Sequence, residues 1–363
     1  MEKVKVGIIG CGGIAVGKHL PSLKKLPEVE LVAFCDIIPE RAEDAKAKFG
    51  NENSKVYTDY HELLKDSEIT VVHVLTPNVS HSPITCDALD AGKHVMCEKP
   101  MAINTAEAQK MIDAAKRNNR KLSIGYQNRF TIASRYLKQE AENGTFGEIY
   151  YAKASALRRR AVPTWGVFLE KDKQGGGPLI DIGTHALDLT LWVMNNYKPK
   201  YCIGSTFNKL NKLDIDEQGN AFGPWDVDKF DVEDSAFGMI VMENGATIML
   251  ESSWALNMLD TREAITTVCG TKAGADMIEI DGIRINGVKN GRQYVNKVNL
   301  ETGGVAFFDG VEEKNPSLNE AKSWINAVIN DTDPIVLPEQ AIVVTKILEG
   351  IYKSAQTGEA YYF

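Results

Sequence analysis

Short apolar runs alternate with helical patterns over the first 126 residues, and this alternation restricts the fold more than any other feature. The apolar runs occupy residues 4–9, 30–35, 69–75, 93–97 and 121–125, and helix-like patterns fill 39–49, 78–91 and 105–119. Buried strands that alternate with helices are typical of βαβ units, in which helices cover both faces of a parallel sheet. The sequence therefore predicts an α/β, doubly wound parallel sheet over residues 1–126.

The pattern changes after residue 126. Helical patterns span 131–143, 178–195, 317–330 and 338–356, while strand-like runs lie at 148–157, 200–207, 234–242, 246–254 and 264–270. The Asn244-Gly245 pair between two of these runs is typical of a β-hairpin. Residues 208–229 form a long polar loop of the kind that is often functional or mobile. We predict a second, α+β domain over residues 127–363, with an antiparallel sheet backed by helices.

The composition narrows the class of protein. With 44% hydrophobic and 25% charged residues in a chain of 363, a large core can be buried. The net charge of −8 argues against nucleic acid or an anionic membrane as the main partner. No apolar run approaches the ~18 residues of a membrane helix, the start carries no secretory pattern, and the six cysteines show no Cys-x-x-Cys spacing. We expect a reduced, soluble, cytoplasmic protein.

The segment "VGIIGCGGIA" ends the first apolar run and contains the spacing Gly10-x-Gly12-x-x-Ala15. The first glycine permits a tight turn, the second lets the backbone approach a diphosphate, and the small third residue lets a helix pack on the strand. An acidic residue, Asp36, closes the second strand 21 residues after Ala15. Its carboxylate can accept the ribose hydroxyls of NAD but would repel a 2′-phosphate. We therefore predict NAD, with NADP less favoured; the alternative is a glycine turn without a nucleotide.

Two further strand ends carry polar residues. Ligands of doubly wound sheets bind beyond the carboxyl ends of the strands, so these side chains are candidates for the same site. They are Thr76, Pro77, Asn78 and His81 after the third apolar run, and Glu98 and Lys99 before Pro100 after the fourth. A solvated turn would also explain the charged pair, but its place at a carboxyl end favours a position beside the nicotinamide.

A second group of candidates lies behind the triple glycine at 175–177. Asp181, His185, Asp188 and Trp192 follow one another at spacings of four, three and four, which places them on one helix face. A carboxylate within one turn of an imidazole suits a general base near neutral pH. Two alternatives are a satisfied core histidine and a metal site of the form Asp-x-x-x-His-x-x-Asp; we expect no metal.

These motifs together resemble the Gfo/Idh/MocA family of oxidoreductases. The motifs "VGIIGCGGIA", "TPNVSH", "CEKP", "GYQNRF", "GGGPLIDIGTHALDL" and "VEDSAFGMIVMENGATIMLESSWA" occur in family order nearly from end to end. The resemblance implies a Rossmann domain followed by an α/β domain whose large open sheet builds homodimers or homotetramers. It also implies NAD(P)-dependent oxidation of a sugar or polyol hydroxyl, or the reverse reduction. By position, the family's catalytic residues fall on Lys99, Asp181 and His185.

The full set of predicted contacts follows from the motifs and the resemblance. The cofactor contacts are Gly10, Gly12, Gly13, Ile14, Ala15, Asp36, Arg41, Thr76, Pro77, Asn78, His81, Glu98, Lys99 and Gln127. The candidate substrate contacts are Arg129, Arg158, Trp165, Phe168 and Asp188. Interdomain hydrogen bonding is an equal alternative for residues 127–129, and a solvated strand is the alternative for the arginine run at 158–160. Trp254 and the histidines at 19, 61, 73 and 94 are expected to be structural.

The predicted reaction is hydride transfer between a hydroxyl-bearing carbon and NAD. His185 takes the hydroxyl proton, Lys99 hydrogen-bonds the same oxygen, and Asp181 holds sugar hydroxyls or the imidazole. The substrate is a sugar, an inositol or a glycoside, selected by the loops at 158–177 and 208–229. One alternative is a redox-neutral family member that retains its NAD, and another is a nucleotide-sensing protein without catalysis.

Overall fold

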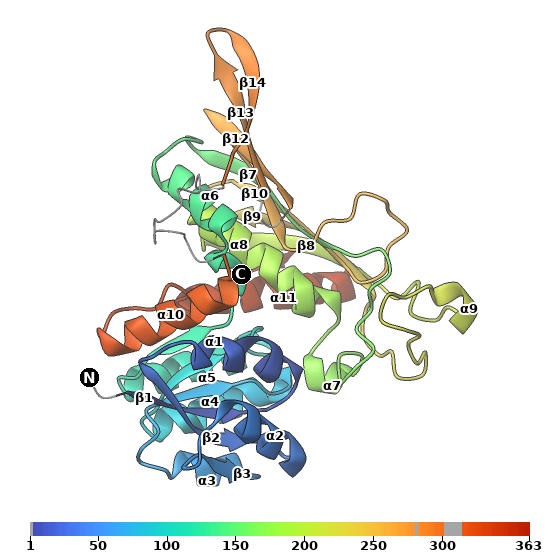
Figure 1. Ribbon diagram of the computed structural model, residues 1–363. Helices are drawn as coiled ribbons and strands as arrows, with labels where there is room; N and C mark the ends of the chain where they lie inside the picture. The colour runs from blue at the N-terminus through green and yellow to red at the C-terminus, as the bar shows by residue number, and fades with distance from the viewer. Residues whose placement is uncertain (1–2, 280–281, 301–313) are drawn as a thin grey trace. The chain divides into compact units, whose positions relative to one another are not determined.

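The computed structural model describes residues 3–279, 282–300 and 314–363, which group into two compact units (Figure 1). The first unit contains the chain up to Gln127 together with Ser317–Thr345. The second contains Asn128–Pro316 and Lys346–Phe363. Each unit is described by itself.

The first unit is built on a parallel sheet that has six strands in the described chain. They are β1 (Val4–Ile9), β2 (Val29–Cys35), β3 (Lys55–Tyr57), β4 (Val71–Val74), β5 (His94–Cys97) and β6 (Leu122–Ile124). Their spatial order is β3-β2-β1-β4-β5-β6, and every neighbouring pair is parallel. This is the doubly wound order. The chain builds the sheet outward from β1 to β3 on one side and from β4 to β6 on the other, so the switch point of the topology lies between β1 and β4. The predicted fold of this half is confirmed, although β3 has too few residues to give an apolar run.

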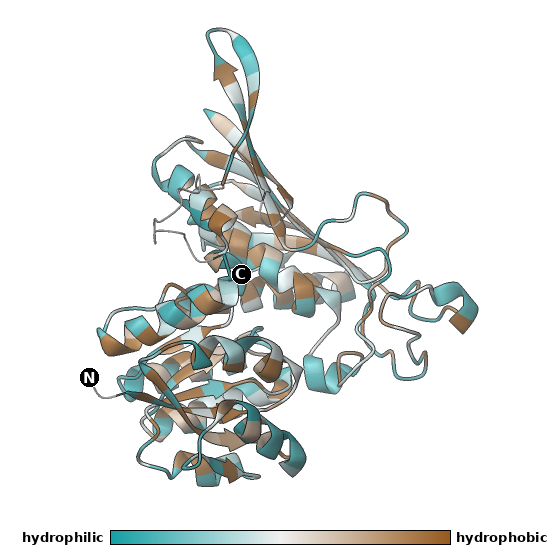
Figure 2. Cartoon of the chain, in the orientation of Figure 1, coloured by the Kyte–Doolittle hydropathy of each residue, from teal (hydrophilic) through white to brown (hydrophobic). Residues whose placement is uncertain are grey.

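Helices connect these strands and cover the sheet. They are η1 (Ala15–His19), α1 (Leu20–Lys24), α2 (Pro39–Phe49), α3 (Tyr60–Leu64), η2 (Asn78–Ser80), α4 (His81–Asp90) and α5 (Thr105–Arg117). The short η3 (Gln127–Phe130) follows β6, where the chain passes from the first unit to the second. Local sequence explains where they begin: Pro39 opens α2, and the Asn104 side chain accepts a hydrogen bond from the Glu107 backbone N–H at the start of α5. Figure 2 shows hydrophobic residues concentrated along the strands that these helices cover.

A helix from the far end of the sequence completes the first unit. It is α10 (Pro316–Ile329), and its buried residues Leu318, Ala321, Trp324 and Ile325 share one apolar cluster with side chains of β1, η1 and α1. Ser123 of β6 also donates a hydrogen bond to the Val336 carbonyl. The sequence predicts one continuous second domain over residues 127–363. In the structure, residues 317–345 from within that range pack with the first unit.

The second unit contains a large sheet that has nine strands in the described chain. They are β7 (Ile149–Leu157), β8 (Pro199–Phe207), β9 (Ser235–Met242), β10 (Thr247–Ser253), β11 (Ile265–Gly270), β12 (Ala273–Glu279), β13 (Gly282–Lys289), β14 (Arg292–Lys297) and β15 (Tyr361–Tyr362). The order is β14-β13-β12-β11-β7-β10-β9-β8-β15. Only the β7–β10 pair among these is parallel, so the sheet is mixed and mainly antiparallel, as predicted.

Helices pack on one face of this large sheet (Figure 1). The helices of the unit are α6 (Ile132–Glu142), α7 (Lys171–Gln174), η4 (Leu179–Gly183), α8 (Thr184–Met194), α9 (Ile215–Gln218) and the end of α11 (Pro338–Thr357). The helix predicted from Pro178 is present, but its first turns are π-helical. It ends at Asn195, whose left-handed φ of 49° forms the C-cap. Within the described residues, no helix is both long enough and apolar enough to span a membrane.

Candidate active site

The glycine loop after β1 is shaped for close approach of a ligand. Gly10 has a φ of +93°, and a Cβ on it would lie 2.6 Å from the Leu75 carbonyl oxygen, so only glycine fits. By contrast, a Cβ at Gly12 or Gly13 would meet nothing within 4 Å. The bare backbone of these two residues therefore faces open space at the point where a dinucleotide diphosphate binds in this fold. Of the neighbouring predicted contacts, Ile14 is exposed and Ala15 is fully buried.

Asp36 lies at the carboxyl end of β2 with its carboxylate held in place. One oxygen accepts the Cys11 backbone N–H at 2.8 Å, and the other accepts the Ile38 backbone N–H at 2.9 Å. The first of these bonds fixes the carboxylate beside the glycine loop. Arg41 is exposed in the first turn of α2, two residues after Pro39. The position of Asp36 fits a ribose contact, as expected from the spacing.

The end of β4 contributes the second predicted cofactor segment. Thr76 and Asn78 are half-buried and Pro77 is exposed. The Thr76 hydroxyl oxygen is buried and has no hydrogen-bond partner among the described residues, which leaves it able to bond a group that enters the site. Together with the open space at Gly12 and Gly13, this orphaned hydroxyl indicates that the edge of the sheet fits a nucleotide cofactor.

His81 links the two loops at the ends of β4 and β5. Its ring is buried, with Nδ1 2.7 Å from the Pro100 carbonyl oxygen and Nε2 2.9 Å from the Thr76 carbonyl oxygen. Burial lowers the pKa of this imidazole, although the two carbonyl groups oppose that shift. The ring therefore spans the loops from inside the protein. This differs from the direct cofactor contact that the sequence predicts.

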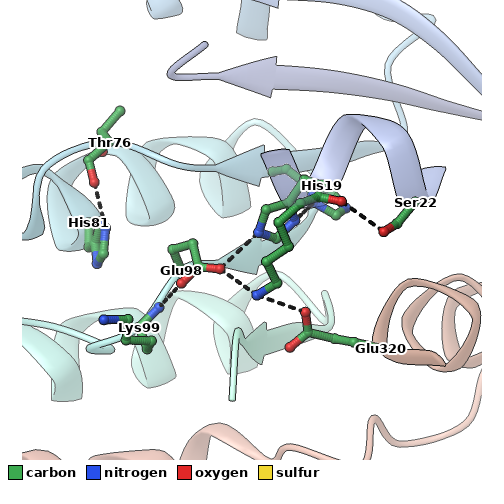
Figure 3. A network of polar contacts seen from close by, with 9 residues as sticks. His19, Ser22, Thr76, His81, Glu98, Lys99 and Glu320 are labelled. Carbon is green, nitrogen blue, oxygen red and sulfur yellow. Dashed lines mark hydrogen bonds and ion pairs between the residues drawn. The ribbon is translucent and has the colours of Figure 1, made fainter. Parts of the chain in front are cut away.

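Glu98 is buried in an ion network rather than exposed to a ligand (Figure 3). One of its carboxylate oxygens accepts hydrogen bonds from Lys18 at 2.6 Å and from His19 at 2.8 Å, and the other accepts the Lys99 backbone N–H at 2.9 Å. Burial alone would raise its pKa, but Lys18 and His19 hold the pKa well below its usual value. We therefore assign Glu98 to the support of the loop, in place of the predicted cofactor contact.

Lys99 follows directly at the carboxyl end of β5. It is half-buried, and the Lys99-Pro100 peptide bond is cis. Because β5 is the neighbour of β4, Lys99 lies one strand away from the point where the strand order reverses. Ligands of doubly wound sheets bind beyond this edge, so Lys99 lies at the edge where a ligand is expected.

In the second unit, the triple glycine before η4 is explained by close packing. Gly175 has a φ of +83°. A Cβ on Gly176 would overlap the Tyr352 hydroxyl, and one on Gly177 would overlap the Glu233 carbonyl oxygen. The buried Glu233 carboxylate accepts the backbone N–H groups of Gly177 at 2.9 Å and Leu179 at 3.2 Å. It therefore caps the first turn of the helix that carries Asp181.

Asp181 and His185 are both half-buried on this helix, Asp181 in η4 and His185 in the first turn of α8. The indole N–H of Trp254 donates a hydrogen bond to Asp181 Oδ2 at 3.0 Å. Trp254 itself is fully buried and lies beside Phe230, with ring centroids 6.3 Å apart. Trp254 is buried, as expected for a structural residue, and it also contacts Asp181, a predicted catalytic residue, directly. Local π-helical turns of this kind are frequent at functional sites.

Asp188 points into a different environment from Asp181. It forms a two-fold ion pair with Arg129, with distances of 2.9 Å to Nε and 2.6 Å to Nη2, and both side chains are buried. Burial raises the pKa of Asp188, and Arg129 partly offsets this rise. A fully buried pair offers no group to a substrate, so we do not carry either residue into the proposed substrate site. Among the described residues no three carboxylate, imidazole or thiol groups gather as a metal site requires.

An exposed aromatic cluster lies where two loops of the second unit meet. Trp165 is 53% exposed, and its ring packs edge-on against Phe168 at 5.8 Å and Phe222 at 4.9 Å. The loops are joined by paired hydrogen bonds between Val162 and Asn220. The two loops predicted to select the substrate thus form one assembly that presents aromatic faces to solvent. Arg158, at the start of this assembly, is paired with Glu263 on the neighbouring loop.

The last predicted cofactor contact is Gln127, which is half-buried at the start of η3. Three further residues support the site, and no sequence pattern singles them out: Lys18, Glu233 and Glu320. A cavity of about 670 Å³ elsewhere in the second unit, lined by residues of α6, α8 and the β9–β10 turn, contains none of the predicted residues and is assigned no role.

The two parts of the chain match two parts of one family. Residues 4–126 match the oxidoreductase family's NAD-binding Rossmann fold, and residues 138–362 match its C-terminal alpha/beta domain. The chain is 35% identical to D-glucoside 3-dehydrogenase of Escherichia coli (strain K12) over 355 residues, which is 98% of this chain and 96% of that protein. It is 32% identical to inositol 2-dehydrogenase of Salmonella typhimurium (strain LT2) over 198 residues, 54% of this chain and 56% of that protein.

Solved structures share the fold over the whole chain. Levoglucosan dehydrogenase in complex with NADH has a TM-score of 0.83 and 22% identity, with 99% of each chain covered. Aldose-aldose oxidoreductase from Caulobacter crescentus, complexed with glycerol, has a TM-score of 0.79 and 22% identity, with 100% of each chain covered. The resemblance read from the motifs is thereby confirmed, and the chain belongs to the Gfo/Idh/MocA family of oxidoreductases.

Proposed function

We propose that this protein is an NAD-dependent dehydrogenase that oxidises a hydroxyl-bearing carbon of a sugar, with glycosides as the first substrate class to test. The observation that carries the proposal is the position of Lys99, fixed at the carboxyl end of β5 and one strand from the switch point of a dinucleotide-binding sheet. The relative that matches 98% of the chain is named D-glucoside 3-dehydrogenase. Inositols and levoglucosan are the next substrates to test, because other relatives carry those names.

NAD is the proposed cofactor in preference to NADP. The Asp36 carboxylate is held by two backbone N–H groups, so it cannot swing away from an incoming ribose without losing both hydrogen bonds. A fixed negative charge accepts ribose hydroxyls and repels a 2′-phosphate. Gly12, Gly13 and Thr76 would hold the remainder of the dinucleotide.

The residues of the two units supply the acid–base chemistry. We propose that His185 accepts the proton of the substrate hydroxyl while Lys99 donates a hydrogen bond to the same oxygen and stabilises its developing charge. Asp181, oriented by Trp254, holds the imidazole or a neighbouring sugar hydroxyl. Bound NAD supplies the hydride acceptor, C4 of its nicotinamide. The approach of Lys99 to His185 is part of the proposal, since the two side chains belong to different units.

The aromatic cluster supports a carbohydrate substrate. The faces of Trp165, Phe168 and Phe222 are suited to stack on the C–H faces of a sugar ring or on the aglycone of a glycoside. No observation favours either alternative function, a redox-neutral enzyme with retained NAD or a protein without catalysis. We further propose that the large sheet forms a homodimer or homotetramer, as the family resemblance implies.

The test is NADH formation, followed by the absorbance of the reduced nicotinamide, on a panel of glucosides, free aldoses and inositols. We expect turnover on at least one member with release of free NADH. Lys99→Ala should lower kcat by about 10²–10⁴-fold with little change in NADH affinity, because the lysine acts on the reacting oxygen. Lys65→Ala, which removes an exposed lysine at the C-cap of α3, is the matched control.

Other outcomes would decide against this function. Cofactor that stays bound through purification, with no free NADH on any substrate, would favour the redox-neutral alternative. Measurable NAD binding with no reaction across the panel would favour the protein without catalysis. A Lys99→Ala variant with wild-type turnover would remove Lys99 from the mechanism.

A further inference from the structure

A second carboxylate reaches the Glu98 network from the far end of the chain. Glu320 of α10 accepts from Lys18 Nζ at 2.9 Å, while the same nitrogen donates to Glu98 at 2.6 Å (Figure 3). All three side chains are nearly inaccessible, with exposed fractions of 8% for Lys18, 5% for Glu98 and 3% for Glu320. Buried ion pairs persist only where geometry is strict, so this arrangement fixes each member.

The surrounding structure leaves Glu98 one place to lie. A Cβ on Gly125, the residue after β6, would lie 3.0 Å from Glu98 Oε1, so a side chain there would crowd the carboxylate. His19 holds the same oxygen at 2.8 Å, and its other ring nitrogen lies 3.1 Å from Nδ1 of His73. The remaining oxygen of Glu98 accepts the Lys99 backbone N–H. The network thus ends on the backbone of the proposed catalytic lysine.

The two carboxyl groups meet Lys18 in different ways. Burial raises the pKa of Glu320, whereas Lys18 and His19 outweigh burial and lower the pKa of Glu98. Glu98 uses both of its oxygens, one for Lys18 and His19 and the other for the Lys99 backbone N–H. Glu320 Oε1 is buried with no hydrogen-bond partner among the described residues, so Glu320 acts on the network through Oε2, which accepts from Lys18.

We propose that Lys18 and Glu320 are positioning residues for Lys99: by fixing the Glu98 carboxylate they set the place of the Lys99 backbone and hence of its ammonium group. This inference rests on the proposed function, in which Lys99 acts on the substrate oxygen. It gives α10 a part in catalysis although α10 contributes no group to the reacting atoms. A helix near the end of the sequence thus helps to aim a lysine in the first unit.

The first test compares full-length Lys18→Met, Glu320→Ala and Glu320→Gln. Displacing a catalytic group by about 1 Å can cost about 10²-fold in rate, so Lys18→Met and Glu320→Ala should lower kcat by roughly 10- to 100-fold while NADH affinity stays near wild type. Glu320→Gln keeps an acceptor for Lys18 and should restore wild-type kcat. Lys5→Met, which breaks the exposed Lys5–Glu68 pair of the same unit, should change nothing. Wild-type kcat in Glu320→Ala, or a loss in Glu320→Gln as large as in Glu320→Ala, would overturn the proposal.

The second test asks whether Lys18 acts through Lys99. Adding Lys18→Met to Lys99→Ala should lower the residual kcat no further, because the group being aimed is already absent. If Lys18→Met lowers kcat by the same factor in the wild-type protein and in Lys99→Ala, the positioning role is overturned. Thermal unfolding is measured for each variant. If Lys18→Met fails to fold, the test uses Glu320→Ala and Glu320→Gln instead, each made in the wild-type protein and in Lys99→Ala. No NADH formation by the wild-type protein on any substrate would defeat the proposed function, and wild-type turnover in Lys99→Ala would remove Lys99 from the mechanism. A slow Lys99→Ala beside fast Lys18→Met and Glu320→Ala variants would defeat only the positioning role.

Discussion

Single residues far apart in the sequence complete this site, and Trp254 is the clearest case. Its indole N–H reaches Asp181 over a sequence separation of 73 residues. A tryptophan at the end of a strand is usually core, and the sequence holds no local signal for such a bond. The Lys18–Glu98 and Arg129–Asp188 pairs are hidden from sequence for the same physical reason, since a contact between distant residues creates no periodicity. In contrast, the four-residue spacing of Asp181 and His185 is a local property of a helix, so the sequence alone predicts that they share one helix face.

We predict that Trp254→Phe lowers kcat/KM by about tenfold. Phenylalanine keeps most of the buried ring, so the main loss is one hydrogen bond to Asp181, and such a bond is worth about 1–1.5 kcal/mol. Steady-state kinetics on the best substrate provide the measurement. Trp324→Phe is the matched control, because Trp324 is also buried but its Nε1 has no hydrogen-bond partner among the described residues. Equal kinetic effects in the two variants would argue that loss of ring volume, and not loss of the bond to Asp181, is responsible.

At the scale of elements, most of both sheets could be predicted and the omissions have physical causes. The runs predicted at 4–9, 39–49 and 148–157 are long and regular, and their boundaries agree closely with β1, α2 and β7. The strands β12–β14 were missed, although Asn290-Gly291 is a hairpin signal and both residues have positive φ. The π-helical turn η4 was not predicted. Its first backbone N–H groups bond to Glu233, which lies in another segment and leaves no local pattern in the sequence.

We predict that Gly177→Ala destabilises the protein by roughly 1–3 kcal/mol, the usual cost of forcing a side chain into packed space. The added Cβ would overlap the Glu233 carbonyl oxygen, so the backbone at the start of η4 must shift and carry Asp181 with it. Thermal unfolding would show the lower stability, and kcat should fall as well. Gly17→Ala serves as the stability control, since a Cβ there meets nothing within 4 Å and alanine favours a helix. Unchanged stability of Gly177→Ala would contradict the packing account of the triple glycine.

At the scale of the whole molecule, the large sheet leaves apolar side chains uncovered. Ile203 of β8 pairs with Met239 of β9, which pairs with Met249 of β10, so the three side chains lie in one row on the same face. Ile203 is 42% exposed and the two methionines are half-buried, whereas neighbouring Cys202 is fully buried. An uncovered apolar row of this kind is typical of a surface that joins protein copies.

We predict a homodimer or homotetramer that Ile203→Arg converts to smaller species. An arginine in the row would place an unpaired charge in the contact between copies. Light scattering after size-exclusion chromatography gives the mass of each form. Lys200→Arg, which keeps a positive charge at an exposed position on the same strand, should keep the wild-type mass. A monomeric wild-type protein would contradict the prediction.

The route of the chain has a consequence for anyone who builds chimeras from this protein. In the division described here the backbone passes from one unit to the other after residues 127, 316 and 345. A fragment cut after residue 127 would leave behind the helix that fills part of its own apolar cluster and supplies Glu320. Exchange of the substrate half between relatives must therefore replace 128–316 and 346–363 as two separate inserts while keeping 317–345 from the cofactor-binding parent.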